Sequence, residues 1–156
     1  MRPRTGLLGN LPALTSAGRV LGWVRRAAPA HTPEPEAWSI VEELLDRLAA
    51  LETRDADVEV ARAGLKLVAA FGWALELERC VRCGKPCPEA RPASLDPARG
   101  GLVCRECGGA RLRVAPERRT RLLAASQGLI AELSGEDARF ALDLVERVLE
   151  THAPGS

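Results

Sequence analysis

Aromatic side chains are scarce in this chain. Its 156 residues include three Trp, two Phe and no Tyr. No aromatic residue lies between Trp73 and Phe140. A nucleic-acid surface built on rows of aromatic rings that stack with bases is therefore disfavoured. Hydrophobic residues still make up 46% of the chain, which is enough for a core. Because that core must consist mostly of Leu, Val and Ala, the composition favours helices.

Long hydrophobic runs are also lacking. No segment approaches the roughly 18 apolar residues that a membrane-spanning helix needs. The apolar stretch near the N-terminus is short and is interrupted by Gly9, Asn10 and Pro12, so no signal peptide is predicted. We therefore expect a cytoplasmic protein without a membrane partner. Thiols stay reduced in that compartment, where clustered cysteines usually bind metal.

The charges of the chain are unevenly distributed, and lysine is nearly missing. The net charge is only +1, and 20 of the 22 basic residues are Arg. Residues 31–78 hold four basic and eleven acidic residues, whereas residues 79–121 hold eleven basic and four acidic ones. This basic segment is either an ordinary solvated surface or a surface that faces phosphates.

Three helices are predicted before the cysteine-rich region. The first spans Leu11–Ala27, with Asn10 as its N-cap and Pro12 in its first turn. The second follows the cap residue Thr32, with Pro33 and Pro35 in its first turn. Its predicted apolar stripe consists of Trp38, Val41, Leu44, Leu45, Leu48 and Leu51.

The third helix is expected to span Ala56–Phe71 and to end at Gly72 in a left-handed conformation. Its predicted buried face consists of Val58, Ala61, Leu65, Val68 and Ala69. Two more helices are predicted, from Pro116 to Leu133 and, after a break at Ser134 and Gly135, from Glu136 to Thr151. The core side of the last one is predicted to hold Phe140, Leu144, Val148 and Leu149.

These patterns predict a mainly α fold, a helical bundle that shares one core. We expect residues 1–156 to form a single domain with an inserted zinc-binding β-hairpin at residues 79–113. In that insertion, Ser94-Leu95 and Leu102-Val103 are strand-like, and the turn between them contains Pro97 and Gly100.

Four cysteines give the sharpest signal. Cys80 and Cys83 form one C-x-x-C pair, and Cys104 and Cys107 form a second pair 20 residues further on. Two intervening residues let both sulfurs of a pair reach one ion, and Zn²⁺ favours four tetrahedral thiolates. The pattern predicts a structural zinc site, since four cysteines leave no position for a catalytic water. The alternatives are disulfides or four unrelated thiols.

The remaining reactive residue types show no catalytic arrangement. Cys87 is predicted to be an ordinary free thiol, although it could replace a neighbouring ligand in a loose site. His31 and His152 are isolated and are predicted to lie at the surface. No phosphate-binding loop, nucleophile elbow or zinc-protease motif is present. We therefore expect no catalytic residue, no enzymatic activity and no small-molecule substrate.

The order of these features resembles the C-terminal part of the bacterial DNA repair protein RecO family. The stretch HTPEPEAW at 31–38 is similar to the segment that opens the second helix in that family. The other matching positions are Gly72, Leu75, Leu77, Cys80, Cys83, Gly84, Pro97, Gly100, Gly101, Cys104, Cys107 and Pro116. The resemblance covers about residues 11–150.

The resemblance implies a non-enzymatic recombination mediator. Proteins of this type act with RecR, displace single-strand-binding protein and help to load RecA on single-stranded DNA. The family normally begins with an OB-fold barrel, to which no segment of this chain corresponds, so single-stranded DNA is expected to bind weakly. The competing hypothesis is a protein–protein adaptor, a helical bundle held together by zinc without direct contact to DNA.

Nucleic-acid contacts are predicted around the two cysteine pairs. If zinc draws the pairs together, the neighbouring basic side chains converge on one surface that attracts phosphate without reading sequence. The predicted residues are Arg79, Arg82, Lys85, Arg105, Arg111 and Arg113.

Overall fold

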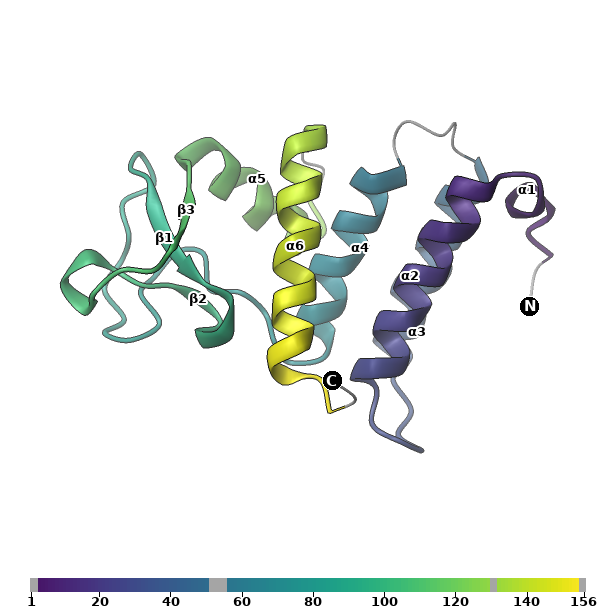
Figure 1. Ribbon diagram of the computed structural model, residues 1–156, viewed down its shortest axis with the longest axis horizontal. Coiled ribbons are helices and arrows are strands. Elements are labelled where there is room, and N and C mark those ends of the chain that lie inside the picture. The colour runs from purple at the N-terminus through teal and green to yellow at the C-terminus, as the bar shows by residue number, and fades with distance from the viewer. Residues whose placement is uncertain (1–2, 51–55, 130–131, 155–156) are drawn as a thin grey trace.

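The computed structural model describes residues 3–50, 56–129 and 132–154. It is mainly helical and carries a small sheet at one end (Figure 1). This arrangement confirms the predicted fold class. The helices are α1 (Thr5–Leu8), α2 (Leu11–Ala27), α3 (Pro35–Ala50), α4 (Ala56–Ala70), α5 (Pro116–Ser126) and α6 (Gly135–His152). None of the described helices is long and apolar enough to cross a bilayer.

Helix α4 lies at the centre of the bundle and packs against α2, α3, α5 and α6. In Figure 1 it stands between α6 on one side and the α2–α3 pair on the other. Gly64 makes this packing close, because a Cβ atom there would lie 2.9 Å from the Trp23 ring and 3.0 Å from a methyl group of Val145. The helix therefore holds α2 and α6 at the distance that a bare backbone permits.

One apolar cluster joins the helices and the sheet. Leu65 of α4 and Leu144 of α6 are buried in it, and Leu45 of α3 packs against it. The prediction of a shared helical core is thus confirmed. Leu95 and Leu102 of the sheet belong to the same cluster. The cysteine-bearing region is therefore fixed to the bundle by hydrophobic contact rather than tethered loosely to it.

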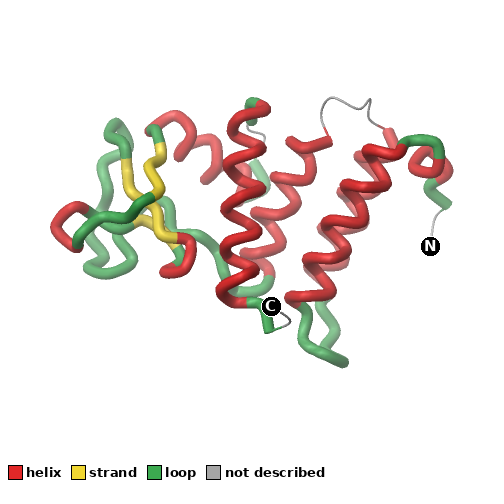
Figure 2. The backbone as a smooth tube through the Cα atoms, viewed as in Figure 1, coloured by secondary structure: helices red, strands yellow, loops and turns green. Residues whose placement is uncertain are grey.

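The sheet has three short antiparallel strands, β1 (Ala93–Asp96), β2 (Gly101–Leu102) and β3 (Leu112–Val114). Their order is β2-β1-β3 (Figure 2). The predicted hairpin corresponds to β1 and β2, which pair Leu95 with Leu102. Strand β3 was not predicted. It pairs with the other edge of β1 and places Leu112 beside Leu95.

Local capping explains several helix ends. The Asn10 side chain accepts a hydrogen bond of 3.2 Å from the amide of Ala13 at the start of α2, as predicted. Beyond the end of α4, Gly72 adopts φ 84°, and the amide of Trp73 donates to the carbonyl of Val68 at 2.7 Å. Gly72 is thus the predicted left-handed terminator. Helix α1 was not predicted.

The second predicted helix needs three corrections. It begins at Pro35, because the amide of Trp38 donates to the carbonyl of Glu34 at 3.0 Å, so Thr32 is not its cap and Pro33 lies outside its first turn. Trp38 is 55% exposed, whereas Ala37 is buried. The small Ala37 side chain lets α3 approach its neighbours, which turns the Trp ring outward. Leu51 lies outside the described residues.

The helix predicted from Pro116 to Leu133 is shorter than expected. It ends at Ser126, because Gly128 adopts φ 75° and the amide of Leu129 bonds back to the carbonyl of Ala124 at 2.9 Å. This bond closes the helix in the manner of a glycine-terminated motif. Three side chains assigned to buried faces, those of Val58, Ala69 and Phe140, are only partly buried.

Candidate metal centre

Two tight turns present the four cysteines. In the first, the amide of Gly84 donates to the carbonyl of Cys80 at 2.9 Å, and Gly84 adopts φ 74°. In the second, the amide of Cys107 donates to the carbonyl of Cys104 at 3.0 Å, and Gly108 adopts φ 98°. A left-handed residue after each pair requires glycine, so each turn reverses directly behind its second sulfur.

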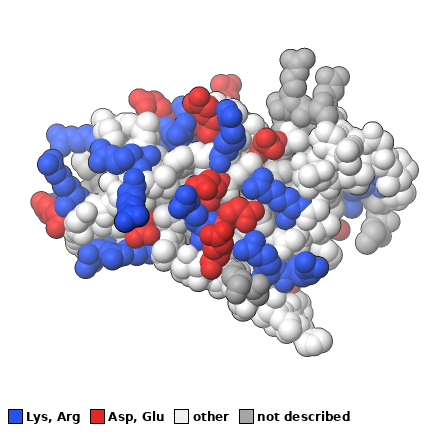
Figure 3. Space-filling view, viewed as in Figure 1, with Lys and Arg blue, Asp and Glu red and all other residues white. Residues whose placement is uncertain are grey.

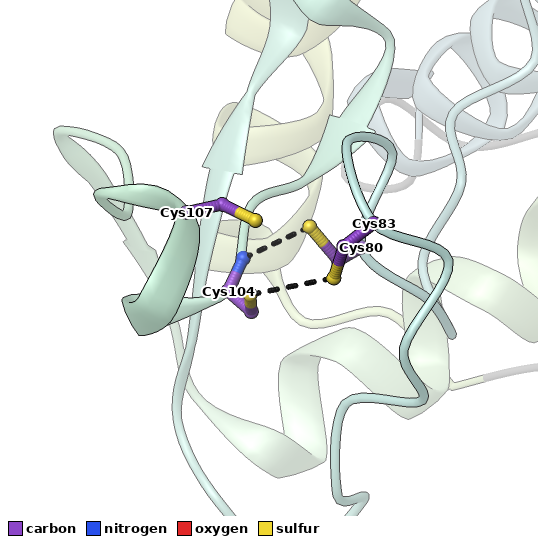
Figure 4. Close-up of side chains that lie close together, drawn as sticks. All are labelled: Cys80, Cys83, Cys104 and Cys107. Atoms are coloured by element: carbon purple, nitrogen blue, oxygen red, sulfur yellow. Dashed lines mark hydrogen bonds between the residues drawn. The ribbon is translucent and has the colours of Figure 1, made fainter.

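Backbone pairing brings the two turns together. The amide of Val81 donates to the carbonyl of Leu102 at 2.9 Å, and the amide of Leu102 donates to the carbonyl of Glu76 at 2.9 Å. The segment that leads into the first cysteine turn therefore runs along β2, which leads into the second. The side chains of both turns point toward a common centre (Figure 4).

The sulfur positions suit one tetrahedral ion. The Sγ atoms of Cys80, Cys83, Cys104 and Cys107 all lie within 4.8 Å of one another. The Sγ atoms of Cys83 and Cys104 are 3.7 Å apart. A tetrahedron with Zn–S bonds of about 2.3 Å has sulfur separations of roughly 3.8 Å. These four cysteines, which can hold a metal ion, are the four that the sequence predicted as ligands.

Backbone amides stabilise the thiolate of Cys80. Its buried sulfur accepts hydrogen bonds from the amides of Cys104 at 3.3 Å and Arg82 at 3.4 Å. Led by the Cys104 amide, these donors lower the pKa of Cys80 to about 6 despite its burial. Hydrogen bonding to Cys104, together with desolvation, raises the pKa of Cys107 to about 12. All four sulfurs can be thiolates at once only if a cation lies among them, which is the chemistry of a metal site.

Cys87 lies outside the cluster. Its half-buried thiol points to the carbonyl of Lys85 at 4.0 Å, and burial raises its pKa above the ordinary value. This environment favours the thiol over the thiolate. It agrees with the interpretation of Cys87 as an ordinary free thiol.

The six predicted DNA-contacting residues fall into two groups. Three of them brace the cysteine turns. Arg79 donates to the carbonyl of Gly84 at 3.3 Å, and Arg82 donates to the carbonyl of Cys107 at 3.2 Å. Lys85 forms an ion pair of 3.1 Å with Glu106, which raises the pKa of Lys85. These contacts link the first turn to the second from outside.

The other three predicted residues, Arg105, Arg111 and Arg113, are exposed. They lie on the second cysteine turn and on or next to β3. In Figure 3, basic side chains gather over the end of the molecule that carries the sheet, with a few acidic ones among them. The structure therefore places positive charge around the cysteine cluster.

Sequence reasoning missed Arg119. This residue is only 4% exposed, and it donates hydrogen bonds to the carbonyls of Cys87 at 2.8 Å and Pro88 at 3.2 Å. It ties the loop that follows the first cysteine turn to helix α5. A signal was present, because Arg119 shares a helix face with Leu122 and Ala125, where an apolar residue is expected.

The fold and the cluster define a class: a helical bundle with an inserted four-cysteine module of the zinc-knuckle type. Comparison with known proteins gives the family. Residues 8–156 match the family described as recombination protein O C terminal. The chain belongs to the RecO family and corresponds to its C-terminal part.

Curated relatives agree with this assignment. Two proteins named DNA repair protein RecO, from Rubrobacter xylanophilus and an Anaeromyxobacter species, are each 32% identical to this chain over 100% and 97% of its length. A third relative of that name, from Geobacter metallireducens, is 25% identical over 94% of the chain. The chain spans 60–64% of the length of these three relatives.

Proposed function

We propose that this chain is a non-enzymatic module of DNA repair and recombination that holds one structural zinc ion and contacts single-stranded DNA. The observation that carries the proposal is the family match over residues 8–156. It is supported by relatives named DNA repair protein RecO and by the arginine-rich surroundings of the cysteine cluster.

The proposed zinc ligands are Cys80, Cys83, Cys104 and Cys107, whose sulfurs are close enough for one ion. Bound zinc would hold the two turns together and neutralise two of the four thiolate charges. In this proposal residues 1–156 act as one domain, with residues 79–113 as its zinc-binding insertion. The shared apolar cluster supports the single domain.

The proposed partners follow from the family. They are single-stranded DNA, RecR and single-strand-binding protein, and the proposed task is to assist the loading of RecA in the bacterial cytoplasm. The proposal includes no small-molecule substrate and no membrane partner. The six basic residues predicted from the sequence form the proposed DNA-facing region, in which Arg105, Arg111 and Arg113 are exposed contacts. Arg79, Arg82 and Lys85 contribute by bracing the cysteine turns.

The test is the fluorescence anisotropy of a labelled oligothymidine titrated with zinc-loaded protein at several salt concentrations. We expect weak binding whose affinity falls steeply as salt rises, since released counterions drive phosphate contacts. A random-sequence single strand should bind equally well. Absence of binding at low salt would overturn the DNA-contacting part of the proposal.

The second candidate is a protein–protein adaptor without direct contact to DNA. Exposed apolar side chains favour it, since Leu8 is 77%, Leu11 74% and Trp38 55% exposed. Large apolar side chains at a surface are typical of protein interfaces when they cluster. If oligothymidine does not bind, the adaptor becomes the preferred function.

A further inference from the structure

A groove of about 710 Å³ runs beside the cysteine cluster. The second cysteine turn, strands β1 and β3, the loop at residues 87–92 and helix α5 form its walls. Cys104 and Gly108 of the cysteine turn line it directly. Four arginines line it as well, and the sequence analysis had singled out only two of them. They are Arg91, Arg105, Arg113 and Arg119.

The positive charges of this groove are not neutralised within the described part of the chain. None of the four arginines forms an ion pair with a described carboxylate. On the same helix α5, by contrast, Arg118 and Arg121 both bind the carboxylate of Asp137, at 2.9 Å and 2.7 Å. The helix thus pairs the arginines on one side and leaves Arg119 to the groove.

Arg119 makes the case for an anion. Its side chain is 4% exposed, and its hydrogen bonds go to the backbone carbonyls of Cys87 and Pro88, which carry no net charge. Burying a positive charge without a counter-ion is costly. A bound anion in the groove would supply that charge, and Arg91, Arg105 and Arg113 would add three more positive charges around it.

The remaining lining favours a phosphodiester over an acidic peptide. It consists of small and cyclic residues, namely Pro88, Pro92, Ala93, Ser94, Val103, Gly109 and Ala110, together with Cys87. No large aliphatic or aromatic side chain offers the apolar pocket that usually anchors a peptide. Ser94 lies opposite Arg113 in the sheet, so a hydroxyl group stands beside a guanidinium. Such a surface contacts phosphates and sugars rather than bases.

We infer that the sugar–phosphate backbone of single-stranded DNA runs through this groove and contacts Arg91, Arg105 and Arg113. Arg119 acts as a positioning residue that shapes the groove by holding the Cys87–Pro88 carbonyls. This inference rests on the proposed function and narrows it. It adds Arg91 to the DNA-contacting residues and removes Arg79 and Lys85 from direct contact, because their side chains are engaged with the cysteine turns.

The test compares three double charge-reversal variants of the full zinc-loaded chain. The groove variant is Arg91→Glu with Arg113→Glu, and the brace variant is Arg79→Glu with Lys85→Glu. The matched control is Arg25→Glu with Arg139→Glu, which makes the same change in net charge on α2 and α6. Zinc content and far-ultraviolet circular dichroism establish that each variant is folded before labelled oligothymidine is titrated at low salt.

We expect the groove variant to bind oligothymidine at least tenfold more weakly than the control variant. Its slope of log affinity against log salt should be smaller by about two, one unit for each lost phosphate contact. Equal affinity of the groove and control variants, with binding by the parent intact, would overturn the groove while leaving the proposed function in place. A parent chain that binds no oligothymidine would overturn both.

Two further readouts decide between ligands and between sites. A polyglutamate peptide that displaces oligothymidine at equal charge concentration would overturn the assignment to a phosphodiester in favour of an acidic peptide. A folded, zinc-loaded brace variant that loses more affinity than the groove variant would move the contact surface from the groove to the outer side of the cysteine turns. We expect neither result.

Discussion

Gly101 lies so close to the backbone of Glu76 that no side chain fits between them. A Cβ atom on Gly101 would overlap the Glu76 carbonyl oxygen and lie 2.9 Å from the Glu76 nitrogen. This contact joins β2 to the segment that leads into the first cysteine turn, and it sets the distance between the two turns. The cysteine cluster therefore depends on a residue that carries no ligand atom.

Gly101→Ala should destabilise the protein and weaken zinc retention together. The new methyl group meets backbone rather than a flexible side chain, so we expect a loss of roughly 2–3 kcal/mol in the free energy of unfolding. Urea denaturation and chelator competition measure the two effects. Gly18→Ala is the matched control, because a Cβ atom there meets nothing within 4 Å, and alanine favours a helix by up to about 1 kcal/mol. Equal stability of the two variants would contradict the role of Gly101.

Cys104→Ser should release the metal and disorder the sheet while the helices persist. The strands are only two to four residues long, so the sheet needs a cross-link to remain ordered. Metal analysis should find no zinc, and far-ultraviolet circular dichroism should retain most of the helical signal. Cys87→Ser is the control, because its sulfur lies outside the cluster, and it should keep its zinc. Loss of helical signal in Cys104→Ser would show that zinc supports the whole bundle.

Asp137 should make stability depend on acid pH. Burial by itself favours the neutral carboxyl, but Arg121, Arg118 and Ser134 outweigh it and hold the pKa of Asp137 well below its ordinary value. A depressed folded-state pKa contributes stability that is fully present above about pH 4 and is lost as the pH falls further.

Asp137→Asn should therefore cost about 2–4 kcal/mol at neutral pH, since it leaves two guanidinium groups without their carboxylate. Both guanidiniums keep some solvent contact, so the lower part of that range is expected. Chemical denaturation between about pH 7 and pH 3 measures the effect. The difference between parent and variant should shrink in acid, and a constant difference would contradict the ion-pair explanation.

Glu146 should stabilise the contact between α2 and α6. It accepts a hydrogen bond of 2.7 Å from the buried indole nitrogen of Trp23, and it pairs with Arg26 at 3.2 Å. Glu146→Ala leaves the indole N–H without its acceptor, which costs about 1–3 kcal/mol. Glu146→Gln keeps an acceptor and should lose less. Thermal unfolding of the two variants compares them, and equal losses would show that the charge, not the hydrogen bond, matters.

Much of the fold was predictable because local signals agreed with packing. Asn10 and Gly72 mark helix ends through their own backbone and side-chain chemistry, which needs no tertiary context. The cysteine pairs were equally clear, since C-x-x-C spacing determines which sulfurs can meet. Signals of this kind are read from a few neighbouring residues.

The failures occurred where packing or pairing decided the outcome. The stripe through Trp38 counted large side chains, but the small Ala37 takes the buried position. Strand β3 exists because β1 offers it a free edge, which three residues of sequence do not reveal. Arg91 and Arg119 come from separate segments that the sheet and α5 bring to one groove. Their convergence is a tertiary property.

The central claim is that a zinc-held cysteine cluster organises an arginine-lined surface for single-stranded DNA. The most direct measurement is the affinity for labelled oligothymidine at low salt before chelation, after removal of zinc and after zinc is restored. The account predicts salt-sensitive binding that falls at least tenfold without zinc and recovers when zinc returns. Unchanged affinity after complete zinc removal would contradict it.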